Sequence, residues 1–354
     1  MSHPELSNYR WPAEWEPHES TWIAWPVNAD TWPGTFERIP AAFATFAAAI
    51  ARFEPVNILA GGASVIENAR PLIDAACEEV SATFDVQFVD IEINDSWCRD
   101  YGPIFLNHKA PTGNDAPQIA VDWGYNAWGG KYPPWEKDAA ATELICARLD
   151  VPCTAPGIIL EGGAIEGNGD GMILTTEKCL LNPNRNPQCS RRQMESFLKK
   201  QLNANTIVWL PGHGVLGDDT DGHIDQVARF VDANTVVVAA PHDADTPEAE
   251  DLRANRVAVA SAWDRHGNSL RVVDLPLPSP KFQGDHRLPA SYCNFYIVNG
   301  GVIVPTFNDS ADDNACSTLQ ELFPSRKIVP VDASDLVWGL GALHCLTQQR
   351  PAVT

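Results

Sequence analysis

Segments with helical periodicity alternate with short apolar segments along the whole sequence, and this alternation limits the fold more than any other feature. Helices are predicted at 36–52, 64–80, 137–149, 190–204, 247–264 and 311–323. Strands are predicted at 86–91, 156–160, 206–210, 270–275 and 327–331, with starts roughly 50 to 70 residues apart. A chain of this kind must pack helices against sheets, so its fold class is α/β.

Hairpin-like segments recur along the same chain. GNGDGMILTT (167–176), VDANTVVVAA (231–240) and VNGGVIVPTF (298–307) each lead from a Gly or Asn turn into an apolar strand, at offsets close to 65 residues. Self-similarity at this period, counted about five times, favours a ring of strand-rich units with one helix each. An ordinary α/β sheet without repeats stays the alternative. No clear linker interrupts the chain, so residues 1–354 are expected to form one domain.

The charge of the chain restricts its partners. Asp and Glu number 46 against 25 for Lys and Arg, which gives a formal net charge of −21. This balance argues against nucleic acid or an anionic membrane as a partner and favours a small cationic ligand. The first residues lack a signal-peptide pattern and no apolar run of about 18 residues occurs, which predicts a cytoplasmic protein. A homo-oligomer is compatible with the sequence.

The chain has nine cysteines, of which Cys345 has unusual surroundings. No C-x-x-C pair occurs and the number is odd, which argues against a zinc knuckle and a disulfide scaffold. Most of the cysteines are therefore predicted to be small core residues. Cys345 instead lies between glycines upstream and the polar run 347–349 downstream, a setting that suits a reactive thiolate.

Polar residues collect in segments that follow the predicted strands. These segments are INDSWCRDYGP (93–103), EGGAIEGNGDG (161–171), PGHGVLGDDTDGHIDQ (211–226) and GLGALHC (339–345). Loops at the strand ends of a ring of units converge on its axis. We therefore expect residues that are far apart in the sequence to share one pocket.

The segment DDTDGHID (218–225) places four aspartates around His223, a pattern that could hold a metal ion. The calcium-loop template fails, because Gly217 and Ala228 fall on its first and twelfth positions. Zinc would need further His or Cys ligands at a recognisable spacing. We therefore expect no metal and no other cofactor. His223 and Asp225, two apart in an extended segment, would instead face one ligand together.

Two further carboxylates are candidates for the same pocket. Asp100 follows Trp97, which offers a flat apolar wall, although Arg99 and Asp100 could equally form a structural ion pair. Glu161 opens a Gly-Gly turn directly after a predicted strand. As a lone feature, Glu161 is a weak signal.

Cys345 is the candidate nucleophile. A thiol beside a protonated imidazole becomes a thiolate near neutral pH, whereas a hydroxyl needs a strong base. His344 is adjacent, but neighbouring side chains of an extended strand point to opposite faces. His223, delivered by another loop, is therefore the expected partner of the thiol.

Two carboxylates, an imidazole and a thiol match the needs of hydrolysis at a guanidinium carbon. Asp100 and Asp225 would hold the planar cation by bidentate hydrogen bonds. Cys345 would attack the carbon, and His223 would protonate the departing ammonia and then activate a water. Glu161 would bond the second imidazole nitrogen of His223.

Eight motifs together resemble a known family. They are WPAEWEPHESTWIAWP (11–26), NDSWCRDYGP (94–103), DWGYNAWGGKYPPW (122–135), LEGG (160–163), LLNPNRNP (180–187), DDTDGHID (218–225), NFYIVNGGVIVP (294–305) and ALHCLTQQRP (342–351). The chain resembles the agmatine deiminases, of the bacterial peptidyl-arginine-deiminase-type group. The match spans nearly the whole chain in register.

The resemblance implies the five-bladed α/β propeller of the guanidine-modifying (pentein) superfamily. It also implies hydrolysis of agmatine to N-carbamoylputrescine and ammonia, in putrescine biosynthesis. The family pattern makes Cys345 the nucleophile, His223 the general acid/base, Asp100 and Asp225 the guanidinium ligands, and Glu161 the support of the histidine. Asp219 becomes a further substrate contact. The chain departs from the family pattern at Cys98, Leu340 and Arg350.

Other functions remain open on the sequence. They are deimination of free or peptidyl arginine, amidino transfer on the same scaffold, and binding of polyamines or arginine without chemistry. Arginine carries an α-carboxylate that would need a cation, for which Arg99, Lys131 and Arg185 are the candidates. Agmatine carries an ammonium instead, which an acidic pocket with Asp219 would favour.

Overall fold

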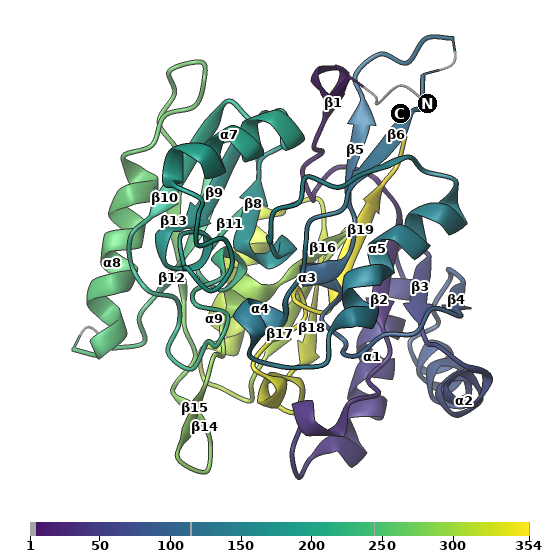
Figure 1. Ribbon diagram of the computed structural model, residues 1–354. Helices are drawn as coiled ribbons and strands as arrows, with labels where there is room; N and C mark the ends of the chain where they lie inside the picture. Colours follow the sequence, from purple (N-terminus) through teal and green to yellow (C-terminus); the bar gives the residue numbers. More distant parts are fainter. Residues whose placement is uncertain (1–4, 114, 244, 354) are drawn as a thin grey trace.

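Mixed sheets with helices on their outer sides make up the fold (Figure 1). The computed structural model describes residues 5–113, 115–243 and 245–353. Five sheets have three or four strands each, and a separate hairpin pairs β14 (Lys281–Gln283) with β15 (His286–Leu288). The α/β class predicted from the sequence is confirmed.

The five larger sheets share one unit: two antiparallel strands, a helix, and a third strand that returns parallel to the second. The sheets are β1 (Tyr9–Arg10), β5 (Ile104–His108), β6 (Gln118–Val121) and β7 (Cys153–Thr154); β8 (Ile165–Gly167), β9 (Met172–Thr176) and β10 (Thr206–Leu210); β11 (Ala228–Phe230), β12 (Thr235–Ala240) and β13 (Arg271–Pro276); β16 (Tyr296–Val298), β17 (Gly301–Thr306) and β18 (Lys327–Asp332); and β19 (Thr347–Pro351), β2 (His18–Ala24), β3 (Val56–Leu59) and β4 (Val86–Val89). In the sheet β8–β9–β10, for example, β8 and β9 are antiparallel and β10 returns parallel to β9.

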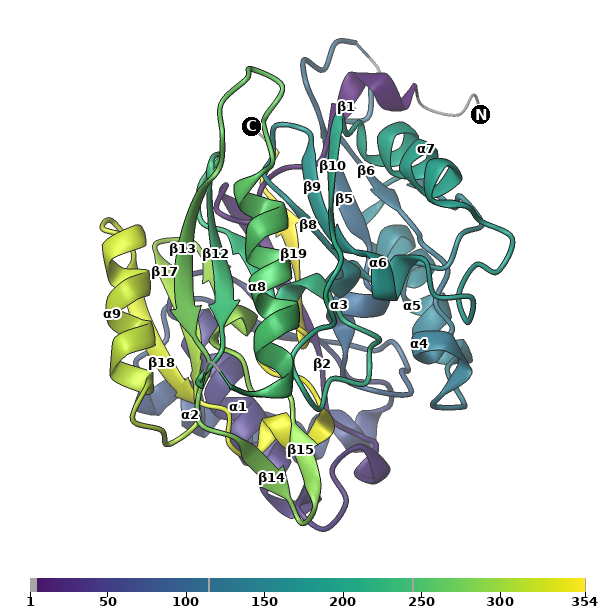
Figure 2. The ribbon, with the colours of Figure 1, turned by 90° about the vertical axis from the view of Figure 1, so that its left-hand side faces the viewer.

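Five of the long helices connect the second and third strands of these units, and α2 connects β3 with β4. The long helices are α1 (Ile39–Ala51), α2 (Ala63–Glu79), α5 (Glu136–Leu149), α7 (Arg191–Leu202), α8 (Pro247–Ala260) and α9 (Asp312–Leu322). Three single-turn helices, α3 (Cys98–Tyr101), α4 (Ala127–Gly130) and α6 (Glu177–Leu180), lie in loops. Figure 2 shows α7, α8 and α9 on the outside of the sheets. All six predicted helices are confirmed, with ends that differ by a few residues.

One predicted strand is wrong. The segment 156–160 forms no strand, and only Ile159 makes an isolated bridge, to Gly124. Pro156 has no backbone N–H to donate, and Gly157 has a φ of +72°, which breaks the extended backbone. The parallel strand of this unit is β7, a few residues upstream. The other four predicted strands correspond to β4, β10, β13 and β18.

The two ends of the sequence meet in one sheet. β19 pairs antiparallel with β2, with Thr347 opposite Ile23, and β2 pairs parallel with β3. Figure 1 shows the yellow C-terminal strand beside the purple N-terminal one. This pairing holds Cys345, two residues before β19, against the first sheet of the chain.

The interior combines a large apolar core with buried charges. The alanine-rich helix α1 buries most of its residues, and its small side chains let α2 and β18 pack closely. Among the buried charged residues are Glu14, Arg99 and Arg229. In the part of the chain that the structure describes, no helix combines the length and the apolar character needed to cross a membrane.

Removal of β19 is expected to destabilise the protein severely. Deleting residues 347–354 leaves β2 without its antiparallel partner and takes two acceptors, Gln349 and Thr347, from the buried guanidinium of Arg99. We expect a loss of at least about 3 kcal/mol in the free energy of unfolding, measured by urea denaturation followed by circular dichroism. Deleting 353–354 alone, beyond the strand, is the control and should cost less than about 0.5 kcal/mol. Equal stability of the two truncated chains would contradict this role of β19.

Candidate active site

A cavity of about 1070 Å³ opens where loops of several units meet. The cavity is lined by the aromatic rings of Trp97, Trp128 and Tyr132. Asp100 and Cys345 line the same cavity. The rings of Trp97 and Trp32 pack at a tilt of 30° with centroids 5.7 Å apart, and Trp97 packs on Gly339 and Gly341. The lining of the cavity therefore combines aromatic rings with carboxylates.

The structure brings together five of the residues singled out in the sequence. His223 Nδ1 lies 3.6 Å from Asp100 Oδ1, and His223 Nε2 lies 3.9 Å from Glu161 Oε2. The thiol of Cys345 lies 3.3 Å from Asp225 Oδ2. These residues come from four segments, and all of their side chains are almost wholly buried.

Gly163 makes this close approach possible. A Cβ at this position would lie 2.6 Å from His223 Nδ1 and 2.7 Å from Asp100 Oδ1, closer than a carbon atom can come. The backbone N–H of Gly163 donates to Asp100 Oδ1 over 3.0 Å. The second glycine of LEGG therefore gives the imidazole and the carboxylate their space.

His223 is held as an imidazolium. Burial alone would lower its pKa, but the charge of Asp100, followed by contacts with Cys179 and Glu161, raises the pKa well above its ordinary value. Neither ring nitrogen has a hydrogen-bond partner among the described residues. The ring is thus protonated, and its two nitrogens lie near carboxylates, just beyond hydrogen-bond distance.

The two aspartates have different surroundings. Burial raises the pKa of Asp100 to about 6, although Trp128 Nε1 donates to its Oδ2 over 2.9 Å. The backbone of Trp128 has a φ of +56°, an uncommon conformation that aims the indole at this carboxylate. Burial would also raise the pKa of Asp225, but the hydrogen bond from His344 outweighs it and the pKa is lowered. Asp225 Oδ1 has no hydrogen-bond partner in the described part of the chain.

The surroundings of Cys345 differ from those expected. The thiol donates to Asp225 Oδ2, and Asn294 Nδ2 lies 3.1 Å from the sulfur, so a carboxylate and an amide occupy the place expected for an imidazole. Burial, and then Asp225 and Asp100, raise the pKa of Cys345 well above its ordinary value, so the thiol is protonated. Asn294 lies in the motif NFYIVNGGVIVP, but its role was not predicted.

His344 does not contact the thiol, as expected, but for a different reason. The segment around Cys345 is a turn and not an extended strand. The His344 side chain reaches Asp225 and Glu14 instead, with nitrogen–oxygen distances of 2.8 Å to each. His344 and Cys345 therefore contact the same oxygen of Asp225.

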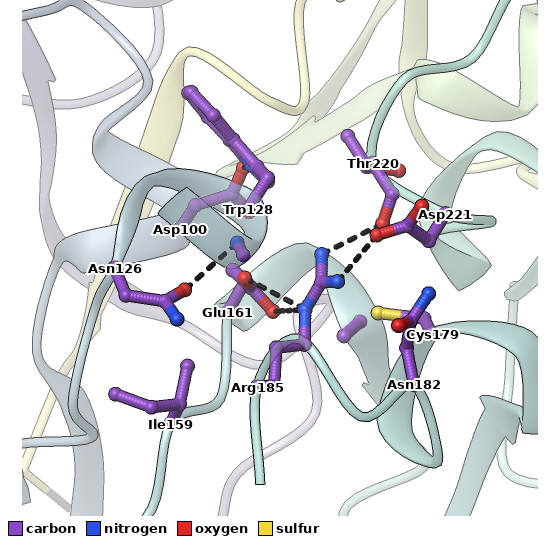
Figure 3. Close-up of polar contacts among 12 residues, drawn as sticks. Asp100, Asn126, Trp128, Ile159, Glu161, Cys179, Asn182, Arg185, Thr220 and Asp221 are labelled. Atoms are coloured by element: carbon purple, nitrogen blue, oxygen red, sulfur yellow. Dashed lines mark hydrogen bonds and ion pairs between the residues drawn. The ribbon is translucent and has the colours of Figure 1, made fainter. Parts of the chain in front are cut away.

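Glu161 is fixed by Arg185 behind the imidazole. Arg185 Nε lies 3.0 and 2.9 Å from the two oxygens of Glu161, and its other nitrogens donate to Asp221 and to the backbone of Thr220 (Figure 3). Burial would raise the pKa of Glu161, but His223 and Arg185 lower it. Glu161 is therefore ionised and faces His223.

None of the three cations named as partners for a substrate carboxylate is free to take that role. Arg99 and Arg185 are buried and engaged within the protein, and neither lines the cavity. Lys131 reaches the cavity, but Asp219 and Asp221 bind its ammonium at 3.1 and 3.0 Å. Asp219 also accepts a hydrogen bond from Tyr132 at the cavity wall.

The aspartates around His223 do not converge on one point. Asp218 caps its own loop, whereas Asp221 binds Arg185 and Asp225 faces His344. A different set, Glu161, Cys179 and His223, places ligand atoms within 4.8 Å of one another. The guanidinium of Arg185 already occupies both oxygens of Glu161 there, which opposes a cation. The expectation of a metal-free site stays a prediction.

Comparisons with known proteins agree on one family. The family model for Porphyromonas-type peptidyl-arginine deiminases matches residues 10–351. The chain belongs to this family. It is 37% identical to an agmatine deiminase of Stutzerimonas stutzeri over 99% of this chain and 98% of that protein, and 38% identical to that of Pseudomonas putida over the same shares.

Solved structures of this family superpose closely. An Enterococcus faecalis agmatine deiminase gives a TM-score of 0.90 at 32% identity, covering 100% of this chain and 99% of that one. A C. jejuni agmatine deiminase variant with substrate bound gives 0.87 at 29% identity, covering 98% and 97%. An amidinotransferase of Microseira wollei shares the fold alone, with a TM-score of 0.54 at 12% identity.

Of the three departures from the family pattern, Leu340 lines the cavity. Its φ of +68° is a left-handed conformation that glycine adopts without strain, which explains why glycine suits this position. Cys98 is buried, and burial raises its pKa to about 12, so it is unreactive. Arg350 donates to Gln118 at the sheet edge. Neither Cys98 nor Arg350 is among the described residues that line the cavity.

Loss of the Arg185 charge is expected to destabilise the protein. Arg185→Met leaves the fully buried carboxylate of Glu161 without its cation, which should cost about 3 to 5 kcal/mol in the free energy of unfolding. Arg191→Met, which breaks the exposed pair with Glu177, is the control and should cost at most about 1 kcal/mol. Urea denaturation measures both. Similar losses for the two variants would show that Glu161 does not depend on Arg185.

Proposed function

We propose that this chain hydrolyses agmatine to N-carbamoylputrescine and ammonia through a covalent intermediate on Cys345. The observation that carries the proposal is the Asp225 carboxylate, whose Oδ2 accepts from the thiol of Cys345 and whose Oδ1 has no partner among the described residues, near Asp100 and a protonated His223. The full-length relatives described as agmatine deiminases support the same activity.

The carboxylates of Asp100 and Asp225 bind the guanidinium. Asp225 Oδ1 lacks a partner among the described residues, so a planar donor beside it gains a hydrogen bond to that oxygen. The aromatic walls of Trp97 and Trp128 exclude water around the alkyl chain. Ionised carboxylates in a dry site bind a cation strongly.

Cation binding also prepares the nucleophile. The charges of Asp225 and Asp100 contribute to the raised pKa of Cys345, and a guanidinium held between them offsets both charges. Asp225 Oδ2 already accepts the thiol hydrogen bond and can take the proton. The thiolate therefore forms next to the carbon that it attacks.

His223 completes the exchange. The thiolate adds to the guanidinium carbon, and the imidazolium of His223 gives its proton to the departing nitrogen, which leaves as ammonia. An amidino-thioether remains on Cys345. Neutral His223 then takes a proton from water, whose oxygen adds to the same carbon. The carbon–sulfur bond breaks with its electron pair on the sulfur, the hydroxyl loses its proton to solvent as the ureido product forms, and Asp225 returns its proton to Cys345. Glu161 favours the charged imidazole at each protonation.

We also propose that the five sheets close into a five-bladed α/β propeller and that residues 1–354 form one domain. The repeated unit, the pairing of β19 with β2 and the fold shared with the amidinotransferase support this arrangement. The cytoplasmic location and a homo-oligomer stay predictions from the sequence.

Agmatine is expected to be preferred to arginine. Arg99, Lys131 and Arg185 are engaged by protein groups, and Arg287, which also lines the cavity, pairs with Glu248. The cavity lining also contains the carboxylates of Asp30, Asp95 and Asp285, which favour an ammonium. We expect kcat/KM for agmatine to exceed that for arginine by at least about 100-fold, on the order of 3 kcal/mol in transition-state binding. Ammonia release, measured side by side without added amine, tests this selectivity. Equal or reversed values would reject agmatine as the substrate, and a requirement for an added amine would indicate amidino transfer.

Replacing Cys345 should separate binding from chemistry. Cys345→Ala keeps Asp100 and Asp225, so we expect no turnover but retained agmatine binding by isothermal titration calorimetry. Because the pKa of Asp100 is raised to about 6, protonation should weaken this binding as the pH falls through about 6.

The wild-type enzyme, quenched during turnover, should show the adduct on Cys345 by mass spectrometry. Cys98→Ala is the control and should keep full activity, since burial makes that thiol unreactive. An adduct elsewhere, or agmatine binding that strengthens below pH 6, would contradict the assigned roles.

A further inference from the structure

A line of buried polar groups connects the N-terminal segment with Asp225. Asp225 Oδ2 lies 2.8 Å from His344 Nδ1, and His344 Nε2 lies 2.8 Å from Glu14 Oε2. The side chains of Asp225, His344 and Glu14 are 0%, 2% and 6% exposed. Glu14 is thus part of the surroundings of the active site, although it precedes β2 and lies 211 residues before Asp225.

Glu14 is a fixed anchor for this line. Its Oε1 accepts from the backbone N–H of Ile297 over 2.9 Å and forms an ion pair with Arg229 Nη2, also at 2.9 Å, and Arg99 lies 3.5 Å from its Oε2. Burial would raise the pKa of Glu14, but Arg229, and then His344, lower it well below its ordinary range. Each oxygen of Glu14 is therefore held by groups outside the cavity.

The two contacts of His344 restrict its protons. Ionised carboxylates only accept hydrogen bonds, and a neutral imidazole donates through one nitrogen. Both 2.8 Å contacts are hydrogen bonds only if Asp225, His344 and Glu14 together hold two protons. Burial and the nearby Arg229 and Arg99 lower the pKa of His344, and the pKa values of Asp225 and Glu14 are lowered too. The neutral ring therefore donates one hydrogen bond to one of the two carboxylates.

We infer that Glu14 and His344 are positioning residues that hold the Asp225 carboxylate with Oδ2 toward Cys345 and Oδ1 toward the bound guanidinium. The geometry supports this role because His344 and Cys345 share Oδ2, while Oδ1 has no partner within the described chain. A carboxylate free to rotate would lose one of these two orientations. The inference rests on the proposed function, since it assigns the guanidinium to Asp225.

A matched pair of substitutions at His344 tests this role. The amide nitrogen of Asn can reach the place of Nδ1, next to Asp225, whereas that of Gln reaches the place of Nε2, next to Glu14. With agmatine we expect His344→Gln to lower kcat/KM at least about 100-fold with a raised KM, and His344→Asn to stay within about 10-fold of wild type. Thermal unfolding of the full-length variants should show similar losses of stability.

His18 offers a control within the same buried region. Its ring nitrogens contact Glu54 Oε1 at 2.9 Å and the backbone oxygen of Glu14 at 2.7 Å, but no residue of the active site. His18→Asn should therefore lower the melting temperature and leave kcat/KM of the folded enzyme within about twofold of wild type. A general loss of packing would affect His18 and His344 variants alike.

The outcomes separate this inference from the proposed function. Equal losses in His344→Gln and His344→Asn, or unchanged kinetics in His344→Gln, would overturn the positioning role. If neither variant folds, Glu14→Gln decides: an about 10-fold lower kcat/KM supports the role, and an unchanged value overturns it. Absence of ammonia release by the wild-type enzyme would instead refute the proposed function.

Discussion

Compensation of buried charge is the constraint on which the rest of the structure depends. Arg229 is fully buried in β11 and forms ion pairs with Glu14 and Glu166. It therefore connects the N-terminal segment and β8 with the sheet that contains β11. Arg99 similarly binds residues of β19 and lies near Glu14. An unpaired buried charge costs several kcal/mol, so each guanidinium fixes the position of the segments that surround it. The cavity is lined by loops that these contacts hold in place.

Local patterns predicted the helices and most of the third strands, because apolar periodicity reflects burial directly. The segment 156–160 shows the limit of such patterns: it is apolar enough for a strand, yet Pro156 and Gly157 prevent one. The pairing of β19 with β2 joins segments more than 300 residues apart, and no local signal in either strand reveals it. The repeat period nevertheless predicted that the chain is built from similar units.

The candidate site was predictable as a set of residues but not as an arrangement. Chemistry and motif resemblance selected Asp100, Glu161, His223, Asp225 and Cys345, which the structure brings together. Their partners were not predictable, because they come from distant segments. LLNPNRNP contains Arg185 without showing that Glu161 is its partner, and nothing near Glu14 in the sequence points to His344.

The protonated state of Cys345 has a consequence for the survival of the protein. Peroxides and other oxidants react with thiolates and hardly with thiols, and the first oxidation product can proceed to irreversible acids. Burial and two carboxylates raise the pKa of Cys345, which favours the less reactive thiol form. We therefore expect oxidation of this sulfur to be slow until a bound cation offsets the two negative charges.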